Sequence, residues 1–344
     1  MTNKQRVLLS IGASIAAVSL CTSATLADSV GKFYKNKTLT IIVGSGAGGG
    51  FGLNGRLIGN RLGKHIPGKP TVIVQFMRGG GGTKAANYVY NISPKDGSVI
   101  SMPISSIVEN QLLRPKGVRF DGAKFNWLGS ITSLGSVLSV WHTAPVKSLD
   151  HAKKTEIIIG ATNPNSSWYR MVKLMNPLLG TKFKIITGFK GSKGVDMAME
   201  RGEVHGRALI WASTKSRRGH WLKANKLVHL AQVGPYALPD LPDLPRLINL
   251  VKTEKQKTMV RFLHLTAIIG RALHTPPGVP RNRVTALRRA FDATVKDPAF
   301  LADFKKRSLP VGPTKGEDLQ AFIQKVIATP KSTVNELKAA LKSK

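Results

Sequence analysis

The chain has 344 residues, of which 42% are hydrophobic and 20% are charged, and its formal net charge is +34. This length is enough for two domains of ordinary size, and the composition excludes an intrinsically disordered chain. Such an excess of positive charge is typical of nucleic-acid binding, but the basic residues are scattered, and the longest runs are pairs such as Arg217-Arg218 and Lys305-Lys306. No zinc-ligand spacing, basic zipper or RNP-like motif accompanies them, so a solvated basic surface is favoured and no nucleic-acid partner is expected.

The first 27 residues have the pattern of a cleavable export signal. Lys4 and Arg6 form a basic start, and the apolar segment from Val7 to Cys21 is too short to span a bilayer comfortably. Thr25-Leu26-Ala27 is a small-x-small cleavage site. We therefore expect residues 1–27 to be a signal peptide and the mature protein to be periplasmic.

Cys21 is the only cysteine in the chain. A lipoprotein signal would place a small residue directly before it, but Leu20 stands there, so an ordinary signal peptide is favoured over lipidation. The mature chain would then begin near Asp28 without any cysteine, and would need no disulfide and have no thiol nucleophile.

Short apolar strands alternate with amphipathic helices in the first part of the mature chain. We expect strands at Leu39–Val43, Thr71–Gln75 and Ser98–Pro103, and helices at Leu53–Leu62, Thr83–Asn91 and from Ser106, where Ser106 and Glu109 fit a capping box. This threefold recurrence of strand, loop and helix predicts a parallel sheet with crossover helices.

Two glycine-rich loops follow the first two of these strands. The first contains Gly44, Gly46 and Gly48 to Gly50, and the second is Gly79 to Gly82. No Asp or Glu occurs between Ser29 and Lys95. Glycine lets the backbone approach a ligand closely, and a helix N-terminus presents free N–H groups. The two loops therefore predict an anion site, most simply for a carboxylate or phosphate, although two plain tight turns remain an alternative.

The nucleotide-binding interpretation of these loops is disfavoured. Gly44-x-Gly46-x-x-Gly49 fits a dinucleotide fingerprint, but the acidic residue expected about 20 positions later is missing, since no Asp or Glu follows the loop before Asp96. The second loop is followed by Thr83-Lys84, where a P-loop needs Gly-Lys-Ser/Thr. We expect no cofactor.

A second unit repeats the alternation. We expect strands at Ile157–Ala161, Phe183–Thr187 and Val204–Ile210, helices at Trp168–Leu179 and Ser192–Arg201, crossings between the units at Leu128–Trp141 and Val228–Val233, and tail helices at Val284–Lys296 and Asp318–Thr329. The turn that ends in Ser166 and Ser167 is expected to cap the helix that follows.

Catalytic constellations are scarce. The sequence has no His-Glu-x-x-His and no Gly-x-Ser-x-Gly motif, and its few carboxylates form no evident acid/base pair. Ser166 and Ser167 are interpreted as helix caps or ligand donors rather than nucleophiles. His142, His205 and His264 are interpreted as packed or surface residues, so we expect no metal site and no enzyme. For Trp211 a pocket wall and core packing are equally favoured.

The mature chain resembles the substrate-binding proteins of tripartite tricarboxylate transporters, the Bug-type family. The resemblance covers almost the whole length and rests on the order and spacing of short blocks. These are Gly48-Gly49-Gly50, Arg56, Gly63 to Pro70, Val72 to Gln75, Gly79 to Gly82, Ala85 to Asn87, Pro94 to Gly97, Phe189-Lys190-Gly191, Gly202-Glu203-Val204, Leu238 to Pro242 and Thr275 to Pro280.

The resemblance implies a type II periplasmic binding-protein fold, in which two α/β lobes are joined by two crossing strands and the ligand lies in the cleft between them. The first lobe would comprise residues 28–135 and 236–344, and the second lobe residues 136–235. The implied partners are a small carboxylate and the membrane permease of the transporter, and the receptor is expected to be a monomer. The implied ligand-binding positions are Ala47, Gly48, Gly49, Gly50, Gly80, Gly81, Gly82, Thr83, Ser105, Ser166, Ser167, Lys190 and Gly191.

The chain departs from the family pattern at two points in the first loop. Ser45-Gly46-Ala47 stands where the family commonly has Phe-Pro-Pro, and Gly52 stands where it usually has Asp. An Asp at this position could pair with an amino group of the ligand and would repel additional carboxylates. Its absence removes both effects. We therefore expect a di- or tricarboxylate ligand rather than an amino acid. Two alternatives stay open: an enzyme acting on a small anion, and a charge-driven binder of nucleic acid or the cell envelope.

Overall fold

The computed structural model describes residues 29–48, 50–132, 135–162, 164, 166–189 and 191–342. The expected export signal, its cleavage site and Cys21 lie outside the described residues, as do Gly49 and Lys190 of the expected binding positions. Among the described helices, none combines the length and the apolar character needed to cross a membrane.

A six-stranded sheet forms one part of the molecule, in the order β11-β4-β10-β3-β1-β2. Its strands are β1 (Thr38–Val43), β2 (Thr71–Phe76), β3 (Val99–Met102), β4 (Asn126–Ser130), β10 (Ala272–Thr275) and β11 (Thr314–Lys315). β1 pairs in parallel with both β2 and β3, as the alternation of strand and helix predicts. β10 pairs antiparallel with β3 and β4, which makes the sheet mixed.

A five-stranded sheet forms the other part, in the order β7-β6-β8-β5-β9. Its strands are β5 (Ser136–Trp141), β6 (Ile157–Gly160), β7 (Phe183–Ile186), β8 (Gly206–Ile210) and β9 (Leu227–Val233). β6 is parallel to β7 and β8, whereas β5 is antiparallel to β8 and β9. The strands expected in the second unit are therefore confirmed, within a mixed sheet.

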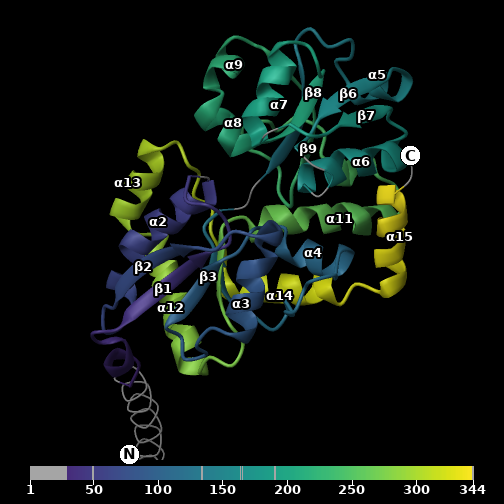
Figure 1. Cartoon of the computed structure of the whole chain (residues 1–344). Coiled ribbons are helices and arrows are strands. Elements are labelled where there is room, and N and C mark those ends of the chain that lie inside the picture. The colour runs from purple at the N-terminus through teal and green to yellow at the C-terminus, as the bar shows by residue number, and fades with distance from the viewer. Residues whose placement is uncertain are drawn as a thin grey trace, which may run out of the picture.

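Helices cover both sheets. They are α2 (Gly50–Leu62), α3 (Thr83–Asn91), α4 (Ile107–Leu113), α5 (Leu149–Lys154), α6 (Ser167–Leu179), α7 (Gly191–Glu200), α8 (Trp211–Arg217), α9 (Gly219–Lys223), α10 (Leu247–Leu250), α11 (Glu254–Ile269), α12 (Arg281–Thr294), α13 (Pro298–Lys306), α14 (Gly316–Ile327) and α15 (Lys331–Lys342). Figure 1 shows the six-stranded sheet together with α2, α3, α12 and α14 in the lower part of the view, and the five-stranded sheet in the upper part. α11 lies between the two parts, and α11 and α15 each contact both α4 and α6.

The chain passes between the two sheets where glycines allow close packing. The stretch Leu128–Trp141, expected as one crossing element, is two strands in two sheets, β4 and β5. Gly135 lies beside the return segment, because a Cβ on Gly234 would be 3.4 Å from the Gly135 Cα. A side chain at Gly135 would also meet Leu238, at 2.5 Å. Both crossing segments thus run side by side.

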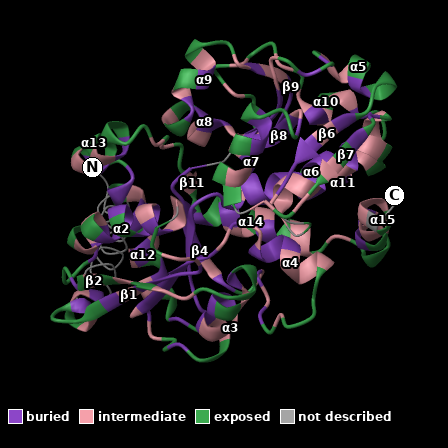
Figure 2. Ribbon diagram, turned by 45° about the horizontal axis from the view of Figure 1, so that its top comes forward, coloured by how far each residue is buried: buried purple, intermediate pink, exposed green. Residues whose placement is uncertain are grey.

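Apolar side chains bury the strands of both sheets. The side chains that are fully buried include Leu39, Ile41 and Val43 of β1 and Val137, Leu138 and Val140 of β5. Figure 2 shows the strands mostly in the buried colour, whereas exposed residues gather on the outer faces of helices and in loops. Each such side chain contributes about 1.5–3 kcal/mol to folding when it is buried.

Asp297 caps α13 and joins it to the turn after α2. Its carboxylate accepts hydrogen bonds from the Ala299 and Phe300 amides at 2.8 and 3.3 Å, and lies 2.9 Å from His65 Nε2. Lys64 forms an ion pair with the same carboxylate. These partners, Lys64 foremost, hold the pKa of the Asp297 carboxyl well below its ordinary value.

Replacing Asp297 by asparagine is expected to make stability less dependent on pH in acid. Because the folded-state pKa is depressed, the carboxylate stabilises the fold above the ordinary carboxyl pKa, and this contribution is lost as pH falls below about 4. The asparagine side chain keeps the helix cap but not the charge. Melting temperatures measured between pH 7 and pH 3 should fall less for D297N than for the wild type, and parallel pH profiles would contradict this.

Candidate ligand-binding site

The loops that follow β1, β2 and β3 meet at one edge of the six-stranded sheet. A Cβ on Gly44 would be 3.4 Å from the Ile104 amide nitrogen and 3.7 Å from the Gly82 Cα. Gly44 directly follows β1, Gly82 ends the second glycine loop, and Ile104 follows β3. The two glycine loops predicted from the sequence therefore lie side by side at the carboxyl ends of parallel strands, where ligands bind in open α/β sheets.

The first glycine loop leads directly into α2, which begins at Gly50. Ala47 and Gly48 are exposed, and the space that a Cβ on Gly48 would occupy is open. The Arg56 guanidinium donates to the Ala47 carbonyl at 3.0 Å, and the Asn54 amide donates to the Gly50 carbonyl at 2.8 Å. The first turn of a helix leaves its backbone amides without intrahelical acceptors, so the amides at the start of α2 can bind an anion.

Gly52 is buried in the first turn of α2, and the loop occupies the space that a side chain there would need. A Cβ would be 2.3 Å from the Ala47 carbonyl oxygen and 2.9 Å from the Ala47 Cα. An Asp at this position would therefore not fit, because the backbone of the loop runs where its side chain would begin.

Replacing Gly52 by alanine is expected to destabilise the protein, although alanine normally stabilises a helix relative to glycine. The added methyl group must displace the backbone of Ala47, and overpacking of this kind costs about 1–3 kcal/mol. Thermal unfolding measures whether the melting temperature of G52A falls, as expected, or rises. Gly48→Ala is the matched control, since its Cβ would have no neighbour within 4 Å and should leave the melting temperature unchanged.

The second glycine loop has a backbone that only glycine adopts readily. Gly79, Gly80, Gly81 and Gly82 have φ values of 143°, 55°, 62° and 94°. Within the loop, the Gly82 and Lys84 amides donate to the Gly79 carbonyl, and the Thr83 amide donates to the Gly80 carbonyl. The amides of Gly80 and Gly81 make none of these bonds. Four successive residues with positive φ explain why the sequence has a run of glycines here.

Ser105 is buried in the loop between β3 and α4, and Ser106 is the N-cap of α4. The expected helix start is therefore confirmed, but the expected capping box does not form, because the Ser106 side chain makes no capping hydrogen bond. The Glu109 side chain turns instead to Arg170 of α6, with which it forms a buried ion pair. A buried guanidinium outcompetes a backbone amide for this carboxylate.

The serines of the second unit lie at the start of α6. Ser166 is the N-cap, and its hydroxyl accepts from the Tyr169 amide at 3.2 Å, as expected. The Ser167 hydroxyl donates to Glu109 at 3.2 Å and lies 3.0 Å from the Thr266 hydroxyl of α11. Ser167 thus links the two parts of the molecule. Its role as a ligand donor stays a prediction, as does that of Gly191, which is exposed at the start of α7.

The structure adds a residue that sequence reasoning missed. Arg271 precedes β10, and its guanidinium lies at the first turn of α2, with the carbon Cζ 3.9 Å from the centre of the Phe51 ring. No sequence signal points to it, since Arg271 and the loop are far apart along the chain and no motif contains both.

Two sizeable cavities lie away from the glycine loops and are lined by other residues. One, of about 580 Å³, lies among α11, α14 and α15 and includes Phe262 and Phe322. The other, of about 570 Å³, includes Trp211 and Pro310, so that Trp211 lines a pocket and donates from its ring to Asp240 at 2.8 Å. In the part of the chain that the structure describes, no group of three or more His, Cys, Asp or Glu side chains could hold a metal ion.

Several solved structures have a fold similar to that of this chain. A TctC solute-binding protein from Polaromonas matches with a TM-score of 0.70 and 19% identity, over 88% of this chain and 99% of that one. An R. palustris protein solved with adipate matches at 0.62 and 21%, over 88% and 97%, and the periplasmic binding protein BugD at 0.61 and 18%, over 89% and 98%. No protein-family model and no curated protein sequence matches the chain. The chain therefore has the fold of periplasmic solute-binding proteins, as expected.

Proposed function

We propose that this protein is a periplasmic receptor that binds a small carboxylate, most simply a di- or tricarboxylate, and delivers it to a membrane permease. The observation that carries the proposal is the pair of glycine loops at one sheet edge, which lie in a stretch of the chain without Asp or Glu and lead into helix N-termini. The fold shared with solute-binding proteins, one of them solved with adipate, supports it.

In this proposal the two sheets belong to two lobes, with residues 28–135 and 236–344 in the first and 136–235 in the second. The ligand is held between them by Gly48 to Gly50 and Gly80 to Thr83 from one side and by Ser166, Ser167 and the loop containing Lys190 and Gly191 from the other. Rotation about the crossing segments closes the site and excludes water. No reaction is catalysed, and the receptor acts as a monomer.

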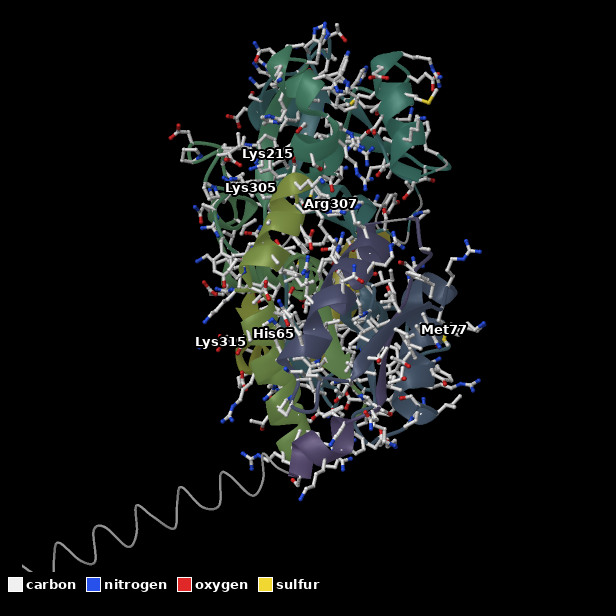
Figure 3. The ribbon with its side chains drawn as sticks, turned by 90° about the vertical axis from the view of Figure 1, so that its left-hand side faces the viewer. His65, Met77, Lys215, Lys305, Arg307 and Lys315 are labelled. Atoms are coloured by element: carbon white, nitrogen blue, oxygen red, sulfur yellow. The ribbon has the colours of Figure 1, made fainter. Side chains whose placement is uncertain are left out.

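The positive charge of the molecule suits the capture of anions. Lys305 and Arg307 lie at the end of α13 that points toward the part bearing Lys215 (Figure 3). Because Lys215 and Arg307 form ion pairs with Asp240 and Asp303, the favourable field comes from the net charge of +34 and not from these two residues. Such a net charge raises the rate of encounter with a negatively charged ligand and makes that rate fall with added salt.

The experiment is a thermal-shift screen of the mature protein against adipate, citrate, succinate, glutamate and a DNA duplex, followed by calorimetric titration of the hits. The proposal expects a selective rise in melting temperature with a few diacids or triacids, since a ligand that binds only the folded state stabilises it. A flat screen with DNA bound at moderate salt supports a charge-driven binder instead, and consumption of the ligand supports an enzyme. A preference for glutamate over citrate would overturn the proposed ligand class.

A further inference from the structure

Arg271 is a buried cation at the site that makes no ion pair with any described residue. It is only 8% exposed, and its Nε atom is buried without a hydrogen-bond partner. Its side-chain hydrogen bond is a weak one, from Nη1 to the carbonyl of the preceding Gly270 at 3.2 Å. By contrast, Arg170, Arg207 and Arg218, which are also buried, each pair with a carboxylate. Burying a charge without a partner is costly, so proteins do it where a ligand supplies the counter-charge.

The Arg271 guanidinium is fixed in position rather than loosely exposed. It stacks on Phe51, and its backbone amide donates to the Ser130 hydroxyl at 3.2 Å. Its Nη2 atom is 3.2 Å from the place that a Cβ on Gly50 would take. A flat guanidinium held against an aromatic ring presents its remaining N–H groups as a fork, which matches a carboxylate.

The Arg271 guanidinium is charged at neutral pH. Burial, and to a smaller extent the charge of Arg217, lowers its pKa to about 10, which is still well above 7. Arg271 therefore needs a counter-charge, which a bound anion would supply.

We propose that Arg271 binds one carboxylate of the ligand at the first turn of α2. This inference rests on the proposed function. It goes beyond the glycine loops, because it assigns the charge recognition to a side chain outside them.

The test compares Arg271→Gln with the control Arg289→Gln, which removes the same charge from an exposed position on α12. Calorimetric titration with adipate measures the affinity of both variants and of the wild type. R271Q should weaken adipate binding about 100-fold, the scale of losing one partner of a buried charged pair. R289Q should leave the affinity unchanged. Adipate binding by R271Q at wild-type strength overturns the inference.

Thermal unfolding with sodium sulfate separates this inference from the proposed function. Sulfate, compared with sodium chloride at equal ionic strength, should raise the melting temperature of the wild type and of R289Q more than that of R271Q. If the wild type binds none of the acids, the proposed function fails, whereas the anion site stands on the sulfate result. An equal sulfate effect in R271Q and the wild type overturns the site, as does no effect in either.

The unliganded stability of R271Q tests whether Arg271 is only structural. Removing an uncompensated buried charge should leave the melting temperature of the unliganded protein equal or higher. A lower melting temperature together with unchanged adipate affinity would overturn the inference.

Discussion

Replacing Glu109 by glutamine is expected to lower the free energy of unfolding by about 3–5 kcal/mol, the range for removing one partner of a buried ion pair. The Glu109 side chain is fully buried and that of Arg170 is 4% exposed, so water cannot solvate the guanidinium once its counter-charge is gone. The pair joins α4, which belongs to the part with the six-stranded sheet, to α6, which belongs to the part with the five-stranded sheet. The stability that is lost is therefore that of the contact between the two parts. Urea unfolding of E109Q and the wild type measures it.

Two further variants make this prediction specific. The double variant E109M/R170M removes both charges and should recover most of the lost stability, since an apolar pair of similar volume replaces a buried ion pair at little cost. Arg201→Gln breaks the exposed pair with Glu203, whose side chains are 56% and 49% exposed, and should change stability little. If E109Q unfolds at the same urea concentration as the wild type, the pair does not stabilise this arrangement.

Replacing Gly48 by aspartate is expected to weaken diacid binding about 100-fold while leaving the fold intact. Gly48 is exposed just before α2, and a Cβ there would meet nothing within 4 Å. The new carboxylate would accept from the amides of the first turn and repel the ligand, which amounts to about 2–3 kcal/mol at a partly buried site. Calorimetric titration of G48D with adipate measures the loss.

Stability and binding should change in opposite directions in G48D. An acidic side chain near a helix N-terminus stabilises the helix by about 0.3–1 kcal/mol, so the melting temperature should stay equal or rise. Gly48→Asn has nearly the same shape without the charge, and its affinity should remain within about threefold of the wild type. Adipate binding by G48D at wild-type strength would place the carboxylate elsewhere.

The sequence predicted the strands well because their signal is local, whereas capping depended on the surroundings. Ser106 and Glu109 fit a capping box that does not form, since Arg170 takes the carboxylate. Thr253 and Gln256 fit the same pattern ahead of α11 and do form it, with the Gln256 amide donating to Thr253 at 3.2 Å. α11 was not predicted although this signal was readable.

The glycine loops of the site were predictable from the sequence, but its buried charge was not. The glycine loops were found because a run of positive φ values requires a run of glycines, as at Gly79 to Gly82. Arg271 was not found, because it lies in a short turn before β10 and belongs to no motif. Only the contact of its guanidinium with Phe51 in three dimensions relates it to the first loop.

The contact between Gly52 and the Ala47 carbonyl also limits how the ligand of this protein can change by mutation. A single codon change at position 52 adds a Cβ that the loop cannot accommodate, at 2.3 Å from the carbonyl oxygen. An aspartate can therefore arise there only after the loop at Ser45 to Ala47 has taken another path. The order of mutations is fixed, with the loop first and the side chain second, and a laboratory selection for amino-acid binding should begin from libraries of the loop.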